Sequence, residues 1–431
     1  MKLLKIQKSF KILTDLKFAI LILGLLALAS SLGSFIEQEE SIQFYEENYA
    51  NKIYGIIDAK FILTFGLDHV YTTWWFLSLL ILLAISLISC TFTRQFPLLE
   101  NSKEYFFKKK GTSFLILPFS VKLKNLYYLP ELLLLKIQEL NFYTYQNRNV
   151  IYGYKGLIGR ISPILVHLSL IIILGGSALG AFKNFKAQEV LPKGELFHIQ
   201  NTIGVGWVTS IPPITTRVND FWVEYENSRI HQFYSNLSIL DEYGKEVKNQ
   251  TISVNNPLRY ENVDFYQSDW NLLGIRVQEK KTNFIYEYPV FNLKGKSWIT
   301  WINLTNQLLV FDQLENTFLT YDEGGNFLGA KNVGDFINEK NLLIDIIPTT
   351  GLLIKYYPTI GIIYFGFGLL MLTACLSYLP YTQIWMFQQQ NYSWIGSTTN
   401  RGKIQVEVEF ENLIRYGENN LNKLSSDKKV Y

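Results

Sequence analysis

His167 is the residue with the clearest potential for chemistry, because it lies inside a long apolar run, residues 156–182. It follows the basic start of that run, Lys155 and Arg160, by about seven residues, or about 10 Å of helix. An ionisable group at that depth in a membrane is costly and usually marks a ligand, a relay or a transport path. The alternative is a neutral imidazole that hydrogen-bonds a neighbouring helix.

The other three histidines, His69, His198 and His231, fall in polar segments and are read as surface residues. Lys155 and Arg160 could bind propionates or phosphates, although membrane topology alone would also put them there. The sequence contains no GxSxG, HExxH, Walker or CxxC pattern, which leaves hydrolase, zinc protease, ATPase and thioredoxin-like functions without support. No metal site and no catalytic residue is predicted.

Composition indicates a membrane protein. Of 431 residues, 48% are hydrophobic and 18% are charged, below the quarter that is usual for soluble chains, and the net charge of +3 is too small to argue for nucleic acid. Four apolar spans of suitable length are predicted at residues 18–36, 74–93, 161–182 and 358–379. For the first span, a cleaved signal peptide is the alternative, since Ala27, Ala29 and Ser31 suit a cleavage site.

The distribution of basic residues predicts the topology. Lysines crowd residues 1–17, and lysines and arginines crowd the loop 94–160, so both segments and the tail 380–431 are expected on the cytoplasmic or stromal side. The acidic loop 37–73 is then expected on the other side. Within the basic loop, Pro130 to Leu140 predicts a small helix, and the segment around Asn147 predicts a hairpin. The polar end of the tail, residues 420–431, is expected to be loose.

Residues 183–355 predict a large all-β, sandwich-like domain between the third and fourth spans. Short aromatic and β-branched segments such as FWVEYE, NFIYEYPVF and SWITWINL alternate with turn signals such as DEYGKE, VNNP and DEGGN. The stretch is long enough to bury its own core. Cys90 and Cys375 both fall in predicted spans, so neither can form a disulfide within this domain.

Several segments in the same order resemble the ResB/CcsB family of system II cytochrome c biogenesis, in its plastid or cyanobacterial form. These are DLKFAILILGLLALASSLGSFIEQ, WWFLSLLILLAISLISCTFTRQFPLL, KGLIGRISPILVHLSLIIILGG and FWVEYENSRIHQFYSNLSILDEYGKEV. The most specific is VNNPLRYENVDFYQSDW, residues 254–270, similar to the family's Val-Asn-x-Pro-Leu-x-Tyr and Tyr-Gln elements. Its marked positions are Asn255, Pro257, Tyr260, Tyr266 and Gln267.

The resemblance implies a subunit that works with a CcsA-type membrane protein to carry heme across the membrane and attach it to apocytochromes c. His167 matches the family's intramembrane histidine and would be a heme ligand, a role that neutral imidazole suits. Trp74 and Trp75 are followed by Phe76, so the Trp-Trp-Asp-type motif is absent and the heme-presenting site is expected on the partner. The expected membrane is the plastid thylakoid, with the β domain in the lumen, or alternatively a bacterial inner membrane.

Two other functions stay open. The chain could be a scaffold that holds the apocytochrome or the partner without touching heme. A weaker alternative is an anchored sensor with a β ectodomain, for which the loop 94–160 looks too small to be an output module. The motif 254–270 is likewise open: it could serve docking, or Asn255 and Pro257 could make a turn while Tyr260 and Tyr266 alternate toward a core.

Overall fold

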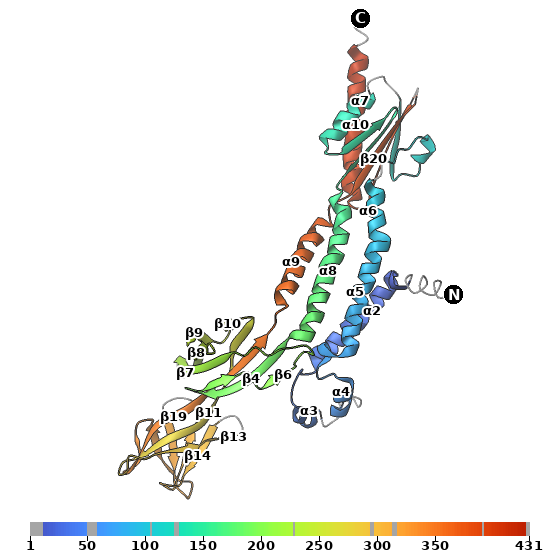
Figure 1. Ribbon diagram of the computed structural model, residues 1–431. Coiled ribbons are helices and arrows are strands. Elements are labelled where there is room, and N and C mark those ends of the chain that lie inside the picture. Colours follow the sequence, from blue (N-terminus) through green and yellow to red (C-terminus); the bar gives the residue numbers. More distant parts are fainter. Residues whose placement is uncertain are drawn as a thin grey trace, which may run out of the picture. The chain divides into compact units, whose positions relative to one another are not determined.

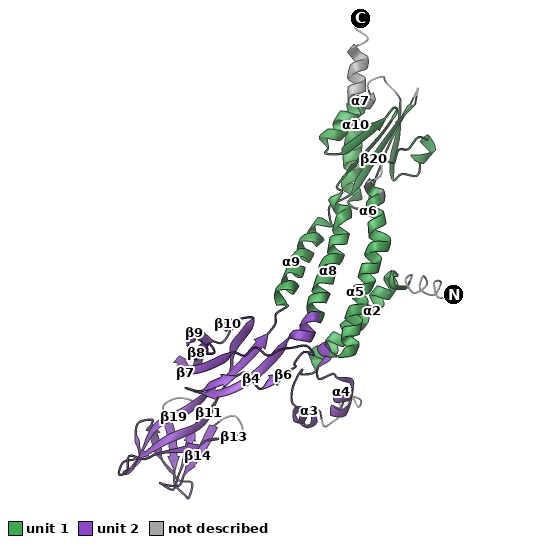
Figure 2. Ribbon diagram, in the orientation of Figure 1, with its two compact units in different colours: residues 1–36, 73–178, 359–431 green, residues 37–72, 179–358 purple. Residues whose placement is uncertain are grey.

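The computed structural model describes residues 12–49, 58–103, 106–124, 129–226, 229–293, 297–312, 317–389 and 392–427 (Figure 1). The chain divides into two compact units (Figure 2). The helical unit consists of residues 1–36, 73–178 and 359–431, and the β unit of residues 37–72 and 179–358. The basic head predicted at Lys2, Lys5, Lys8 and Lys11 lies outside the described residues.

Three helices are long and apolar enough to cross a membrane. They are α2 (Leu16–Phe35), the continuous helix Trp74–Glu100, and α8 (Ile158–Lys183). The second begins as α5 (Trp74–Cys90), passes through a π-helical turn at Thr91–Gln95 and runs into α6 (Phe96–Lys103). The last apolar helix, α9 (Ile360–Leu376), has 17 residues, fewer than the ~20 that a span usually needs. Three predicted spans therefore coincide with helices of full length, and the fourth with a shorter one.

Glycines let α8 and α9 approach closely. A Cβ atom on Gly176 would lie 2.9 Å from Cγ1 of Ile363, and one on Gly366 would lie 2.7 Å from Cγ1 of Ile173. Small residues at such contacts are typical of membrane helices, which associate through close van der Waals packing. The two helices run side by side in Figure 1.

A five-stranded antiparallel sheet joins segments that are far apart in the sequence. The order is β1-β21-β20-β3-β2. Its strands are β1 (Phe119–Lys124), β2 (Tyr143–Asn147), β3 (Val150–Lys155), β20 (Thr382–Gln388) and β21 (Tyr392–Thr399). Helices α7 (Leu129–Glu139) and α10 (Lys403–Asp427) complete the fold, and the buried side chains of Ile137, Ile384, Ile395, Phe410 and Leu413 form its core.

This arrangement corrects the expectation of a loose C-terminal end for residues 420–427, while residues 428–431 lie outside the described residues. Residues 420–427 are the last part of α10, a helix that begins at Lys403 and is amphipathic. The apolar residues of its earlier turns, Phe410, Leu413 and Ile414, are buried against α7 and the sheet. The packing of the first turns stabilises the helix, which then extends into the polar residues 420–427 that show no apolar pattern of their own.

The β unit is all-β apart from its first loop, as predicted. Three antiparallel sheets have the orders β10-β11-β19-β4-β6, with β12 beside β11 and β18 beside β19; β13-β14-β15-β16-β17; and β5-β7-β8-β9. The strands are β4 (Phe185–Pro192), β5 (Leu196–His198), β6 (Thr202–Ile203), β7 (Thr215–Glu226), β8 (Arg229–Leu240), β9 (Glu246–Ser253), β10 (Leu258–Tyr260), β11 (Val263–Glu279), β12 (Ile285–Pro289), β13 (Phe291–Leu293), β14 (Ser297–Ile302), β15 (Gln307–Phe311), β16 (Thr317–Tyr321), β17 (Phe327–Asn332), β18 (Phe336–Asn338) and β19 (Asn341–Tyr356).

Two hydrophobic cores share the long strands β11 and β19. The first contains Phe185, Val218, Leu237, Phe265 and Ile354, drawn from the first and third sheets. The second contains buried side chains of β11, β14, β15, β16, β18 and β19, including Trp298, Phe311 and Phe318. Because β11 has 17 residues and β19 has 16, each strand contributes to both cores.

The first loop of the β unit forms two short helices, α3 (Ile42–Asn48) and α4 (Ala59–Phe65). The hydroxyl of Tyr49 donates to Oε2 of Glu37 at 2.5 Å. Glu39 forms an ion pair with Lys186 of β4. Gly204 permits this pair, because a Cβ atom there would lie 2.4 Å from Oε1 of Glu39.

Candidate functional site

His167 of α8 contacts the π-helical turn. Its Nδ1 lies 2.9 Å from Oγ1 of Thr91, and its Nε2 lies 3.1 Å from Nε2 of Gln95. Thr91 and Gln95 are the first and last residues of the turn, four residues apart and therefore on one face of the helix. Short π-helical insertions occur often at functional sites.

The hydrogen bonds assign the tautomer of His167. The hydroxyl of Thr91 donates to the carbonyl of Leu87 at 2.8 Å, so its oxygen accepts the proton of Nδ1. Nε2 then carries the lone pair and accepts from the amide of Gln95. The other end of that amide, Oε1 of Gln95, is buried with no hydrogen-bond partner among the described residues. Nε2, the nitrogen able to bind a metal, is thus covered by the amide of Gln95, whose nitrogen has a hydrogen-bond partner and whose oxygen has none in the described structure.

Arg160 lies on α8 seven residues before His167, two turns away on the same face. Its guanidinium lies 5.0 Å from the ring centroid of Tyr381, and its Nε is buried without a hydrogen-bond partner in the described structure. The hydroxyl of Tyr381 donates to the carbonyl of Ser102 at 2.9 Å. Lys155, the other cation here, forms an ion pair with Glu409 at 2.6 Å. Lys155 is thus neutralised by an ion pair, whereas Arg160 retains an N–H donor without a partner in the described structure.

The motif 254–270 divides into a turn and a buried polar contact. Asn255 has φ 68°, in the left-handed region that asparagine tolerates, and the carbonyl of Pro257 accepts from the side chain of Gln250. Tyr260 packs at the edge of the first core. Burial, with the charge of the neighbouring Asp264, raises the pKa of Tyr266.

Gln267 is the buried member of the motif. Its Oε1 accepts from the hydroxyls of Ser235 and Thr350 at 2.5 and 2.9 Å, and its Nε2 donates to the carbonyl of Asp269 at 2.8 Å. A buried amide that is satisfied in this way ties β8, β11 and β19 together. The contacts of Gln267 are structural, and a docking role for the other residues of the motif stays a prediction.

The other histidines have exposed side chains. His69 lies 2.8 Å from Asp68, His231 lies 3.3 Å from Glu226, and His198 lies 3.3 Å from the hydroxyl of Thr215. Within the described ranges, no three His, Cys, Asp or Glu side chains gather as a metal site.

Comparison with known proteins agrees with the resemblance seen in the motifs. The model of the ResB-like family matches residues 16–285. Cytochrome c biogenesis protein Ccs1 of Thalassiosira pseudonana is 44% identical over 422 residues, 95% of this chain and 100% of the relative. CcsB of Crocosphaera subtropica is 40% identical over 429 residues, 95% of this chain and 94% of the relative. Ccs1 of Pyropia yezoensis is 38% identical over 413 residues, 93% of each chain. This chain belongs to the ResB-like family, together with the cytochrome c biogenesis proteins Ccs1 and CcsB.

Proposed function

We propose that this chain is a membrane subunit of the system II machinery that matures cytochromes c. With a CcsA-type partner, it delivers heme across the membrane for covalent attachment to apocytochromes c. The observation that carries the proposal is the 44% identity to a cytochrome c biogenesis protein across its entire length. Heme is the cargo of this process, and the attachment chemistry belongs to the complex with the partner.

Four spans are part of the proposal. Strand β20 pairs with β3 and with β21, and β21 pairs with β1, so these four strands must lie on one side of the membrane. Because α8 leaves that side, the chain has to cross again before β20, and α9 is the apolar helix available. The positive-inside rule makes this side stromal or cytoplasmic. The β unit then faces the thylakoid lumen or, in a bacterium, the extracytoplasmic space.

His167 is the proposed contact of this chain with heme. Heme iron accepts a neutral imidazole as an axial ligand. The tautomer of His167 suits this role, because Nε2 holds the lone pair. Gln95 covers that nitrogen, so its amide has to move before Nε2 can bind iron. Arg160, two turns nearer the basic end of α8, offers donors for an acidic group such as a propionate.

A scaffold that never contacts heme is the second candidate. It is favoured by a specific observation: both ring nitrogens of His167 already have partners within hydrogen-bonding distance. In that case the imidazole joins α8 to the Trp74–Glu100 helix, and the β unit holds the apocytochrome or the partner.

Two measurements test these proposals. A strain lacking the chain should lose covalently bound heme from all its c-type cytochromes, detected by heme staining of denaturing gels; normal staining would refute the maturation role. The complex purified with its CcsA-type partner should lose bound heme in His167→Ala and regain it with added imidazole. Unchanged heme content in that variant would leave the scaffold function.

A further inference from the structure

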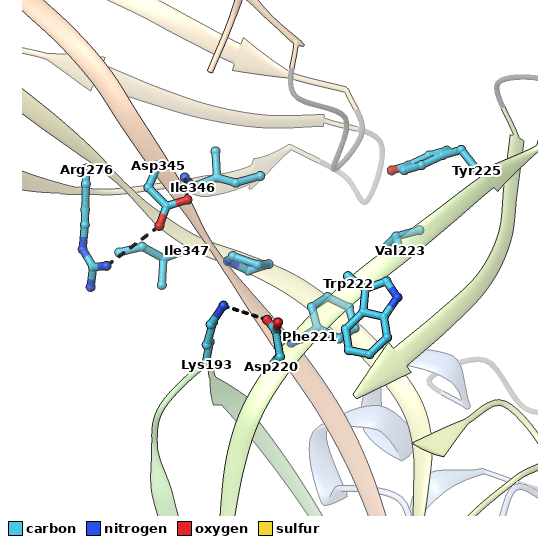
Figure 3. Close-up of a pocket in the computed structure, with 11 residues that line it drawn as sticks. Lys193, Asp220, Phe221, Trp222, Val223, Tyr225, Arg276, Asp345, Ile346 and Ile347 are labelled. Carbon is cyan, nitrogen blue, oxygen red and sulfur yellow. Dashed lines mark hydrogen bonds and ion pairs between the residues drawn. The ribbon is translucent and has the colours of Figure 1, made fainter. Parts of the chain in front are cut away.

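A groove of about 810 Å³ opens in the β unit (Figure 3). Residues 220–223 of β7 line one side and residues 345–348 of β19 line the other. The side chain of Trp222 is 41% exposed there and stacks on Tyr234 with ring centroids 5.4 Å apart. Strands β7 and β19 therefore form the two long sides of the groove, and Lys193 and Arg276 add to its lining.

The β7 side of the groove is a free strand edge. Strand β5 pairs only with residues 215–217, and Val218 pairs with Gly194 and Glu195. Beyond Val218, no described strand pairs with this side of β7, while β8 pairs with the other side. The free stretch, residues 219–224, presents about 20 Å of edge at ~3.4 Å per residue.

Hydrogen bonds show which backbone groups point into the groove. The N–H of Phe221 donates to Oδ1 of Asp220 at 2.9 Å, so it lies outside the ladder with β8. The N–H of Phe233, the register partner of Val223, is likewise held by its neighbour Gln232 at 3.0 Å. Because residues of an antiparallel ladder alternate, the backbone groups of both Phe221 and Val223 face the free edge.

The β19 side repeats this arrangement. Strand β4 pairs with residues 349–356, and β18 with residues near 341 and 342, which leaves 344–348 without a described strand on that side. The N–H of Ile346 donates to Oδ1 of Asp345 at 2.9 Å. Each Asp that holds an edge N–H also faces a cation: Asp220 lies 2.8 Å from Lys193, and Asp345 lies 4.0 Å from Arg276.

The charges of the groove indicate the kind of occupant. Lys193 and Arg276 balance Asp220 and Asp345, so the lining favours an uncharged ligand such as a peptide backbone over a polyanion. A free strand edge binds a segment whose own N–H and C=O groups are unpaired, which a folded protein seldom offers and an unfolded chain does. The exposed indole of Trp222 adds an apolar surface for side chains.

We propose that this groove binds an extended segment of apocytochrome c, which adds as a strand to β7 and displaces the Asp220 carboxylate from the Phe221 N–H. This rests on the proposed function, which supplies a heme-free polypeptide as substrate. The groove then keeps that polypeptide extended and prevents its aggregation before heme attachment.

A photo-cross-link from the edge tests the proposal. The full chain, purified with its CcsA-type partner and carrying p-benzoylphenylalanine in place of Trp222, is irradiated with an apocytochrome c whose heme-binding cysteines are replaced by alanine. We expect a cross-link to the apocytochrome and none to the folded holocytochrome. The control carries the photoreactive residue in place of Tyr243, which is 93% exposed in a turn away from the groove. Cross-links only to the partner or to a second copy of the chain would overturn the proposal.

Strand pairing is tested separately from proximity. Val223→Pro removes an N–H that faces the groove and leaves the β8 ladder intact, a position where proline is tolerated. We expect apocytochrome cross-linking to fall about tenfold, with Leu328→Pro in the edge strand β17 as the control. Should Val223→Pro fail to fold, the cross-linked peptide is resynthesised with N-methyl groups on alternate residues and must compete about tenfold less well against the unaltered protein.

Equal competition by methylated and unmethylated peptides would overturn strand addition. The proposed function fails by a different result: a strain lacking the chain that still matures its c-type cytochromes.

Discussion

The side-chain amide of Gln95 lies 3.1 Å from Nε2 of His167, on the nitrogen that carries the imidazole lone pair. This contact separates the two roles that a histidine in a membrane helix can have. While the amide stays in place, His167 joins two helices; in the proposed heme-binding role, the amide moves and the same nitrogen binds iron. If His167 binds heme as proposed, Gln95 is the side chain that competes with the iron for Nε2.

Removal of this amide should increase heme binding. In Gln95→Ala, heme no longer competes with a hydrogen bond of about 1 kcal/mol, so we expect its affinity for the purified complex to rise about fivefold. A spectrophotometric heme titration measures the change. Gln146→Ala, which alters an exposed glutamine of β2, serves as the control. The same gain in a Gln95→Ala/His167→Ala double variant would show that His167 is not the ligand.

The sheet predicts a specific labelling pattern for the topology. In a chain without Cys90 and Cys375, Gln146→Cys and Glu407→Cys lie in segments tied together by β3 and β20, and should react with an impermeant maleimide from the same side of sealed vesicles. Glu242→Cys, in the turn between β8 and β9, should react only from the opposite side. Labelling of Gln146→Cys and Glu407→Cys from opposite sides would contradict a fourth span at α9.

The sequence was most informative where one physical signal dominates. Long apolar runs predict helices because a segment that crosses a membrane has to satisfy its own backbone hydrogen bonds. Three of the four runs coincide with helices of full length. Alternation in segments such as SWITWINL predicts strands, and Trp298, Thr300 and Ile302 are indeed buried on one face of β14. These signals are local, so they predict a helix or a strand even when the segments that pack against it are unknown.

Signals that need distant partners were missed. IWMF and YSWIG read as a tail, yet β20 and β21 complete a sheet begun more than 200 residues earlier, with Trp385 opposite Tyr152. The contact of His167 with Gln95 joins residues 72 positions apart, and the groove depends on where β5, β4 and β18 end. The residue pattern of a short segment cannot predict these contacts, because they arise from strand register and helix packing between distant segments.

Gly159 should not tolerate a side chain. A Cβ atom there would lie 2.1 Å from the carbonyl oxygen of Leu379, which is backbone and cannot rotate away. Gly159→Ala is therefore expected to destabilise the protein by about 1–3 kcal/mol or more, the range for overpacking. The thermal midpoint of the purified chain measures this loss. Gly175→Ala in the same helix meets nothing within 4 Å, so an equal loss in that variant would refute the steric cause.

Ionisation of Tyr49 at high pH should destabilise the first loop of the β unit, residues 37–49. Burial, together with the hydrogen bond to Glu37, raises the pKa of Tyr49 to about 12, whereas in the unfolded chain it ionises near 10. The folded state thus binds more protons between these values, so the contribution of Tyr49 to stability is complete below pH 10 and is lost as the pH rises through 12.

Hydrogen exchange of residues 37–49 measures this loss. We expect the protection factors of the wild type, which are exchange rates corrected for the base-catalysed intrinsic rate, to fall across that interval. Tyr49→Phe should remove this fall because phenylalanine does not ionise. Tyr243→Phe, which alters a residue that is 93% exposed, should keep the wild-type profile. If Tyr49→Phe also kept it, the alkaline opening of the loop would have to come from another group, such as the ion pair between Lys186 and Glu39.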